Sequence, residues 1–427
     1  MKLLAFLIVV FVSVFSAKSQ TYFPPLTGTT WETIPPSDLG WCDDSIQVLY
    51  DFLEGSDSKA FIVLKDGKIV LEKYFGTFTQ DSVWVWNSAG KTLTAYAVGI
   101  AQTEGLLNIN DPSSDYLGTG WTSLTPTQEA AITIRHQLTM TTGLDEGVSF
   151  DCTDPICLEY LADPGTRWSY HNSPYTLLDG VIENASGLTL NQYVQQKIGS
   201  KIGMTGLFFP NGYNNVFVSK PRSMARFGLL LSQDGVWNGT TVQSDVNYLN
   251  DMRTPSQTLN NSYGYLTWLN GQSSFMLPSS QLVFPGSTIP NAPDDLYAAL
   301  GKNGQIINVV PSQGLVIVRM GSSMGNSYVG NQYNDTIWQH INNLGCTAGI
   351  SENANDFWSI QSNPTTNVIT INGLSNADKV ALYSPAGQRI EVARINNDLD
   401  VSTLPRGMYF VRLERNGVMR TLRIVLE

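Results

Sequence analysis

Two groups of strand-like segments stand far apart in the chain, with a long helix-rich stretch between them. The first group, KAFIVLKDGKIVLEKYFG, predicts a β-hairpin that turns at Asp66-Gly67. The second group, LYAAL, QIINVV and LVIVRM, predicts three further strands, and a candidate helix flanks each group (DDSIQVLYDFLEG and NDTIWQHINNLG). One antiparallel sheet built from both groups, flanked by helices, gives an α/β fold in which Ser88 to about Asn291 form a helical insertion over one edge.

The length of 427 residues suits a large core with a second module attached. Residues 1–19 carry one early lysine, an unbroken apolar run and then small residues, the pattern of a secretory signal peptide. No later segment is apolar and long enough to form a stable membrane span. We therefore expect a signal peptide (1–19), a main domain (20–346), a linker (347–356), a C-terminal domain (357–427) and a secreted or cell-surface location.

The C-terminal segment reads as short strands separated by turns, which predicts a small β-sandwich. It has more Lys and Arg than Asp and Glu, whereas the whole chain has a net charge of −11. The stretches NPTTNVITI, VALYSPAGQRI, DVSTLPRGMYFVRL and TLRIVL resemble the C-terminal sorting domain of the type IX secretion pathway. That resemblance implies the secretion machinery as a partner; the alternative is a carbohydrate-binding or adhesive module.

The four cysteines are candidates for disulfides because export leads to an oxidising compartment. Cys152 and Cys157 lie in one short loop and predict a local bridge, with a zinc half-site as the weaker alternative. Cys42 precedes the first flanking helix and Cys346 follows the last one, so antiparallel packing of these helices would bring their sulfurs together. A second bridge is predicted there.

The acidic net charge opposes nucleic-acid binding, and no basic run compensates for it. His136, His171 and His340 have no metal-ligand spacing, and no HExxH motif occurs. Neither a metal nor an organic cofactor is implied.

A serine three residues before a lysine begins the apolar-periodic segment SAGKTLTAYAVGIAQ. Residues three apart on a helix are neighbours, so Lys91 can reach the hydroxyl of Ser88. The helix N-terminus and partial burial both disfavour a charged lysine, and a neutral lysine can act as the general base for a serine nucleophile. Alone, the spacing also fits an exposed helix lysine.

Two further segments supply polar groups of the right kind. WSYHNSPYTLLDG places Tyr170, a candidate proton carrier between two cations, beside Asn172, a candidate donor to a substrate carbonyl. ALGKNGQIINVV places Lys302, Gly304 and Gln305 at the start of a strand. There glycine permits close backbone approach, and the Gln305 N–H could complete an oxyanion hole. Each segment alone is also compatible with an ordinary turn.

Together SAGK, YHN and KNG, in this order, resemble the serine β-lactamase-related superfamily. This group includes class C β-lactamases, D-alanyl-D-alanine peptidases, β-lactamase-like esterases and 6-aminohexanoate-dimer hydrolases. The resemblance implies Ser88 as nucleophile, Lys91 as its base and Tyr170 as proton shuttle. It also implies Asn172 and Lys302 as substrate-orienting groups, and the N–H groups of Ser88 and Gln305 as the oxyanion hole.

One departure bears on the substrate. Asn303 stands where β-lactamases and peptidases have a Thr or Ser whose hydroxyl helps to bind a carboxylate. We therefore expect an exported serine hydrolase that acts on an ester or amide, with a peptide or β-lactam less favoured. The alternative is a catalytically silent protein that binds cell-wall or polymer fragments.

A second serine motif, GSSMG at 321–325, fits a nucleophile elbow, but the helix, acid and histidine that this motif requires do not follow in the usual order.

Overall fold

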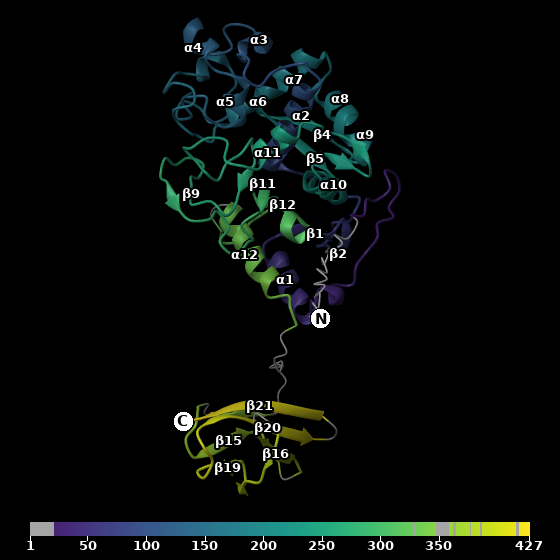
Figure 1. Ribbon diagram of the computed structural model, residues 1–427, viewed down its shortest axis with the longest axis vertical. Helices are drawn as coiled ribbons and strands as arrows, with labels where there is room; N and C mark the ends of the chain where they lie inside the picture. The colour runs from purple at the N-terminus through teal and green to yellow at the C-terminus, as the bar shows by residue number, and fades with distance from the viewer. Residues whose placement is uncertain are drawn as a thin grey trace, which may run out of the picture. The chain divides into compact units, whose positions relative to one another are not determined.

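A computed structural model of the chain describes residues 21–327, 330–346, 358–361, 364–375, 377–384, 387–415 and 418–427. The predicted signal peptide (1–19) and linker (347–356) lie outside the described residues. The chain divides into two compact units, one ending at Gly345 and one beginning at Cys346 (Figure 1). Each unit is described separately below.

A six-stranded antiparallel sheet forms the centre of the first unit. Its order confirms that strands from the two ends of this unit share one sheet, because β1 lies directly beside β13 and Val63 faces Ile317 across the pair. The strands in spatial order are β2 (Lys68–Tyr74), β1 (Ser58–Lys65), β13 (Leu315–Gly321), β12 (Gln305–Val310), β11 (Tyr297–Gly301) and β8 (Trp268–Leu269).

Helices cover both faces of this sheet. A Cβ at Gly228 of α10 (Pro221–Ser232) would meet the side chains of Val316 and Ile307, so α10 packs on one face. Asn308, the next residue on β12, points to the opposite face and exchanges two hydrogen bonds with Asn334 of α12 (Gly330–Asn342). Helix α1 (Asp43–Gly55) packs against α12 on that second face (Figure 1).

The insertion is mostly helical, as predicted, and it contains one small extra sheet. Helix α2 (Gly90–Thr103) crosses its centre and is buried from Gly90 to Ala101. The extra sheet has the order β3 (Trp84–Val85), β5 (Asn214–Ser219) and β4 (Gly206–Asn211). The remaining helices are α3 (Ser114–Leu117), α4 (Pro126–Ala130), α5 (Ile134–Leu138), α6 (Asn172–Thr176), α7 (Leu178–Ser186), α8 (Leu190–Val194), α9 (Ser200–Ile202) and α11 (Val246–Met252). Two hairpins, β6 (Val236–Trp237) with β7 (Thr240–Thr241) and β9 (Ser274–Phe275) with β10 (Phe284–Pro285), complete this unit.

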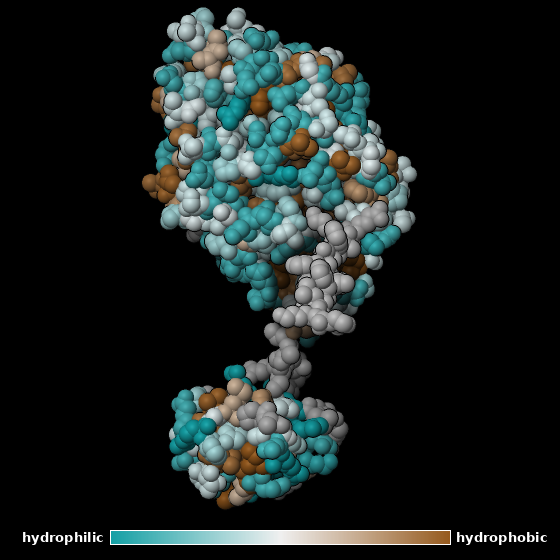
Figure 2. Space-filling view, in the orientation of Figure 1, coloured by the Kyte–Doolittle hydropathy of each residue, from teal (hydrophilic) through white to brown (hydrophobic). Residues whose placement is uncertain are grey.

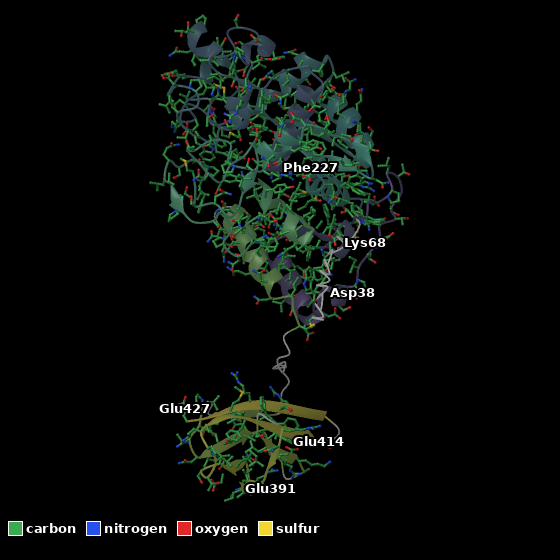
Figure 3. The ribbon with its side chains drawn as sticks, viewed as in Figure 1. Asp38, Lys68, Phe227, Glu391, Glu414 and Glu427 are labelled. Atoms are coloured by element: carbon green, nitrogen blue, oxygen red, sulfur yellow. A yellow bond between two sulfur atoms is a disulfide. The ribbon has the colours of Figure 1, made fainter. Side chains whose placement is uncertain are left out.

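Aromatic residues join the insertion to the sheet. Phe227 of α10 lies in the interior of the unit (Figure 3) and is fully buried. Its ring centroid is 5.9 Å from that of Trp86 and 5.8 Å from that of Tyr96 on α2. This packing fixes the start of α2 against the rest of the core.

The second unit is built from strands around its own core, with Leu382, Val411 and Ile424 among its fully buried residues. One sheet has the order β14 (Ser359–Ile360), β15 (Val368–Asn372), β19 (Asp398–Asp400) and β18 (Arg394–Ile395). The other has the order β17 (Arg389–Ile390), β16 (Lys379–Tyr383), β20 (Gly407–Arg415) and β21 (Val418–Leu426). Asp378 accepts hydrogen bonds from Arg415 and from the Trp358 indole, which ties the two ends of this unit together.

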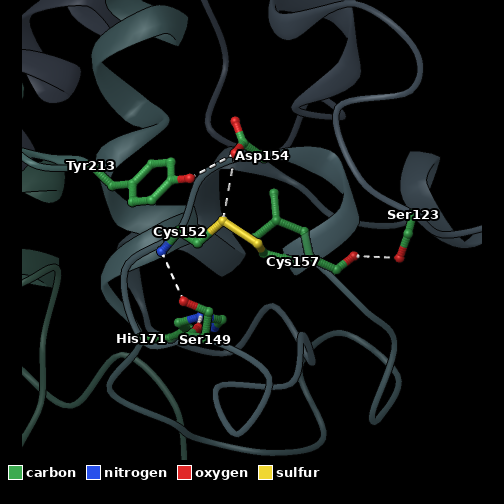
Figure 4. Close-up of a disulfide and its surroundings, with 8 residues drawn as sticks. Ser123, Ser149, Cys152, Asp154, Cys157, His171 and Tyr213 are labelled. Atoms are coloured by element: carbon green, nitrogen blue, oxygen red, sulfur yellow. Dashed lines mark hydrogen bonds between the residues drawn. A yellow bond between two sulfur atoms is a disulfide. The ribbon is translucent and has the colours of Figure 1, made fainter.

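A disulfide joins Cys152 and Cys157, so the zinc alternative fails for this pair (Figure 4). Cys42 and Cys346 are also disulfide-bonded, and Trp41 and Gly345 beside them form an antiparallel bridge. Within the described ranges, no helix is both long and apolar enough to cross a membrane.

Candidate active site

Ser88 lies in a tight turn, Asn87–Ala89, that runs directly into α2. Trp86 anchors the chain just before it: its indole donates to the Ser219 hydroxyl at 2.8 Å, and its backbone N–H donates to Phe217 at 2.8 Å. Asn87 takes a left-handed conformation with φ of 48°. The turn therefore presents Ser88 at the N-terminal end of α2, as the spacing predicted.

Lys91 is buried in the first turn of α2, and its Nζ lies 3.3 Å from Ser88 Oγ. The same nitrogen lies 3.9 Å from the ring centre of Tyr175 and 5.3 Å from that of Tyr170. Burial lowers the pKa of Lys91 to about 7, while Asp179 on α7 acts in the opposite direction when it is ionised. Burial also raises the pKa of Asp179 to about 7. A substantial fraction of Lys91 is therefore neutral near pH 7 and able to accept a proton.

Tyr170 is buried beside this pair and lines the same cleft. Its ring is stacked with those of Phe150 and Trp268, at centroid distances of 6.4 and 6.0 Å. Burial raises the pKa of Tyr170, and a hydrogen bond with the Ser88 side chain opposes that rise only in part. The easily ionised tyrosine expected from the sequence is thus replaced by a neutral hydroxyl, because desolvation outweighs the nearby polar groups.

Asn172 begins α6 and reaches the cleft, and its Oδ1 is buried without a hydrogen bond from any described residue. The backbone N–H groups of Asn172 and Ser173 donate to the Phe150 carbonyl. His171 is buried, and its Nε2 lies 2.9 Å from the Ser149 carbonyl oxygen. The YHN segment therefore also holds the loop that carries the 152–157 disulfide (Figure 4).

Lys302 lines the cleft where β11 ends. A Cβ at Gly301 would lie 2.4 Å from the Trp86 carbonyl oxygen and 2.9 Å from the Ala89 nitrogen, so this strand end touches the Ser88 turn. Asn87 Nδ2 donates to the Lys302 carbonyl at 2.9 Å and fastens the contact. The end of β11 is thus the strand edge beside the serine.

Gly304 and Gln305 are absent from the described residues that line the cleft, in contrast to the sequence expectation. Gly304 has φ of 71° and packs against Arg319 and Tyr333, and the buried Gln305 side chain donates to the Gly321 carbonyl. The turn between β11 and β12 spans residues 302–304, so Gly304 ends this turn and Gln305 begins β12.

The cleft has a volume of about 320 Å³, which suits a small organic group. Most of its walls are apolar, and Lys302 is the one charged side chain among the described residues that line it. Sequence reasoning missed this apolar wall. The lining residues are Ser88, Phe150, Tyr170, Asn172, Trp268, Leu277, Pro278, Leu300, Gly301, Lys302, Met324, Gly330 and Asn331.

The rival motif borders the cleft only through Met324, and its central serine is absent from the described lining residues. Ser323 sits in the loop after β13, where its carbonyl accepts from Arg319, while His340 stacks on Phe52. Across the described segments, no three His, Cys, Asp or Glu side chains gather closely enough to hold a metal ion.

Comparison with known families gives two matches. The family model described as Beta-lactamase matches residues 53–337, most of the first unit and well over half of the chain. The chain belongs to the Beta-lactamase family. The model described as Secretion system C-terminal sorting domain matches residues 360–427. This Beta-lactamase family member thus carries a sorting domain, which indicates secretion through the type IX system.

Individual proteins are similar to this chain in sequence or in fold. An uncharacterized protein of Alkalihalophilus pseudofirmus is 25% identical over 314 residues, which cover 65% of this chain and 87% of that protein. A putative 6-aminohexanoate-dimer hydrolase from Bacillus anthracis shares the fold with a TM-score of 0.55 and 19% identity, covering 69% of this chain and 82% of that one. A putative beta-lactamase from Bacteroides dorei shares it with a TM-score of 0.57 and 16% identity, covering 71% and 98%.

Proposed function

We propose that this Beta-lactamase family member hydrolyses an ester or amide through an acyl-enzyme on Ser88. The observation that carries the proposal is the 3.3 Å approach of the buried Lys91 Nζ to Ser88 Oγ at the wall of a cleft. A serine hydroxyl attacks a carbonyl only when a base takes its proton, and Lys91 has both the position and the lowered pKa for that role.

The reaction runs in two balanced halves. Ser88 Oγ bonds to the carbonyl carbon as its proton passes to Lys91, and the carbonyl oxygen takes up the negative charge. The bond to the leaving group then breaks while the Tyr170 hydroxyl relays a proton to the leaving atom. In the second half, a water oxygen bonds to the acyl carbon as one of its protons passes to Lys91 and Tyr170. The bond from the acyl carbon to Ser88 Oγ then breaks, Oγ takes up that proton, and the acid is released.

The oxyanion hole is proposed to pair the Ser88 N–H with that of Lys302, in place of Gln305. Gly301 brings this strand end against the Ser88 turn, and Asn87 holds the Lys302 carbonyl. Donors on such a tightly fixed backbone stabilise a developing oxyanion without having to reorganise.

Esters and simple amides fit this site better than β-lactams. The side chain that β11 contributes to the cleft beside Gly301 is that of Leu300, which has no hydroxyl to hold a carboxylate. Asn303 is absent from the described residues that line the cleft, and its backbone carbonyl accepts from Arg319.

The test is hydrolysis of p-nitrophenyl butyrate and of nitrocefin by the full chain, with Ser88→Ala and Ser323→Ala as matched variants. We expect ester turnover that is lost in Ser88→Ala and kept in Ser323→Ala, with nitrocefin untouched. Rapid hydrolysis of nitrocefin would indicate that the protein is a β-lactamase. If no ester is hydrolysed and a fluorophosphonate leaves no adduct on Ser88, the silent binding protein is the better description.

A further inference from the structure

Two loops beside the cleft display large apolar side chains to solvent. One is the disulfide loop, in which Val148 and Phe150 are exposed and Phe150 also lines the cleft. The other, residues 276–283 between β9 and β10, contributes Leu277 and Pro278 to the cleft. Leu282 and Val283 of this second loop are 67% and 59% exposed. Figure 2 shows a hydrophobic group at the left edge of the unit, over the β9 region.

Hydrogen bonds and the disulfide hold the backbone that carries these side chains in place. Phe150 is fixed by the two N–H groups that donate to its carbonyl and by the neighbouring disulfide. The second loop is fixed by the stacked rings of Phe275 and Phe284 at 5.4 Å and by Gln281, whose Nε2 donates to the Trp168 carbonyl at 3.1 Å. A single exposed apolar side chain is ordinary, but apolar side chains that gather on a fixed backbone beside a cleft indicate a binding surface.

The position of this surface indicates which part of the substrate it would bind. Phe150, Leu277 and Pro278 of the two loops line the cleft that holds Ser88, and the described lining residues are mostly apolar, with Lys302 as the one charged side chain. The acyl group stays on Ser88 Oγ until water arrives, so the wall around the serine must accommodate this part throughout the reaction.

We propose that the acyl part of the substrate is an extended apolar chain, which passes Phe150, Leu277 and Pro278 and continues over Leu282 and Val283. The proposal rests on the serine hydrolase function given above and specifies its substrate class: esters or amides of medium-length aliphatic acids. Such a chain covers the exposed side chains only when it is longer than the cleft itself.

The first test compares kcat/KM for p-nitrophenyl acetate, butyrate and octanoate with the full chain. We expect octanoate to exceed acetate by on the order of tenfold or more, because each buried methylene group strengthens apolar binding several-fold. In the double variant Leu282→Ser/Val283→Ser the octanoate-to-acetate ratio should fall by at least about threefold. The control Val48→Ser/Val246→Ser, with equally exposed valines on α1 and α11, should leave the ratio unchanged.

An octanoate-to-acetate ratio at or below one in the parent, or an equal ratio in the parent and the double variant, would overturn this proposal, while acetate turnover would still support the hydrolase.

A binding measurement tests the proposal if no ester is hydrolysed. Calorimetry on Ser88→Ala should give tighter binding of octanamide than of acetamide, and the added Leu282→Ser/Val283→Ser changes should weaken octanamide alone. No difference between the two amides would refute the proposed chain site. A change of oligomeric state in the double variant, without a change in chain-length preference, would assign these residues to contact between copies instead.

Discussion

At the scale of single residues, Lys91 sets the pH dependence. Its lowered pKa of about 7 means that it becomes a neutral base as the pH rises through 7. We predict that kcat/KM for an ester climbs by about tenfold per pH unit below about pH 6, bends near pH 7 and is level above about pH 8. A pH–rate profile checks this. A profile that is flat from pH 5 to 9 would contradict a role for Lys91 as the base.

Tyr170 offers a second test at this scale. Tyr170→Phe keeps the ring that stacks with Phe150 and Trp268 and removes only the hydroxyl. We expect kcat to fall by on the order of a hundredfold, because a positioned proton carrier contributes about that much, while KM changes little. Steady-state kinetics measure both constants, and thermal unfolding should show that the fold is kept. An unchanged kcat would remove Tyr170 from the proton path.

The predicted residues that meet at the site share one property: their neighbours in sequence largely fix where they point. Ser88 lies in the turn that leads into α2 and Lys91 in the first turn of α2, while Tyr170 lies two residues before Asn172, the first residue of α6. Gly304 and Gln305 are absent from the described lining of the cleft, because a hairpin turn can face either way and the sequence carries no signal for the position at which β11 ends. The environment of Tyr170 also escaped prediction, since its burial depends on rings from distant segments.

At the scale of elements, the contact between β11 and the Ser88 turn depends on a missing side chain. Gly301→Ala would place a methyl group 2.4 Å from the Trp86 carbonyl oxygen, so the turn must shift. We predict that kcat falls at least about tenfold, because small displacements of catalytic groups are costly. Gly55→Ala at the end of α1, where no atom lies within 4 Å of the added methyl, is the matched control. Equal activity of the two variants would show that this contact is not needed.

The disulfide loop is the second element to test. Replacing Cys152 and Cys157 by serine removes a bridge that closes a short loop, which corresponds to a loss of roughly 2 kcal/mol from the free energy of unfolding. The Phe150 wall should also loosen and raise KM for esters. Denaturant unfolding and ester kinetics on the double variant check both effects. A lower stability with unchanged KM would limit the bridge to a structural role.

The main strands and the two flanking helices could be predicted because each is a long apolar or periodic run. The β9–β10 hairpin and the β3–β5–β4 sheet could not. Their strands are short or lie within the helix-rich insertion, and β3 pairs with a strand more than a hundred residues away, as in Trp84 with Ser219. Tertiary contacts, with little help from local propensity, place these elements.

At the scale of the whole molecule, the two compact units have separate cores. We predict two thermal transitions in calorimetry of the full chain. Deletion of residues 347–427 should remove one transition and leave ester hydrolysis intact. A single transition that disappears on deletion would mean that the units depend on each other for stability.

In cells with a type IX system, deletion of residues 347–427 should keep the hydrolase from reaching the exterior.

The central sheet imposes an order of events during synthesis. Strand β1 finds its neighbour β13 only after about 250 further residues have been made, as the pairing of Val63 with Ile317 shows. The turn that carries Ser88 likewise meets β11 only after Gly301, the last residue of that strand, has been made. A growing chain therefore lacks both the closed sheet and the complete cleft until β13 has been made, and contacts so distant in sequence form slowly.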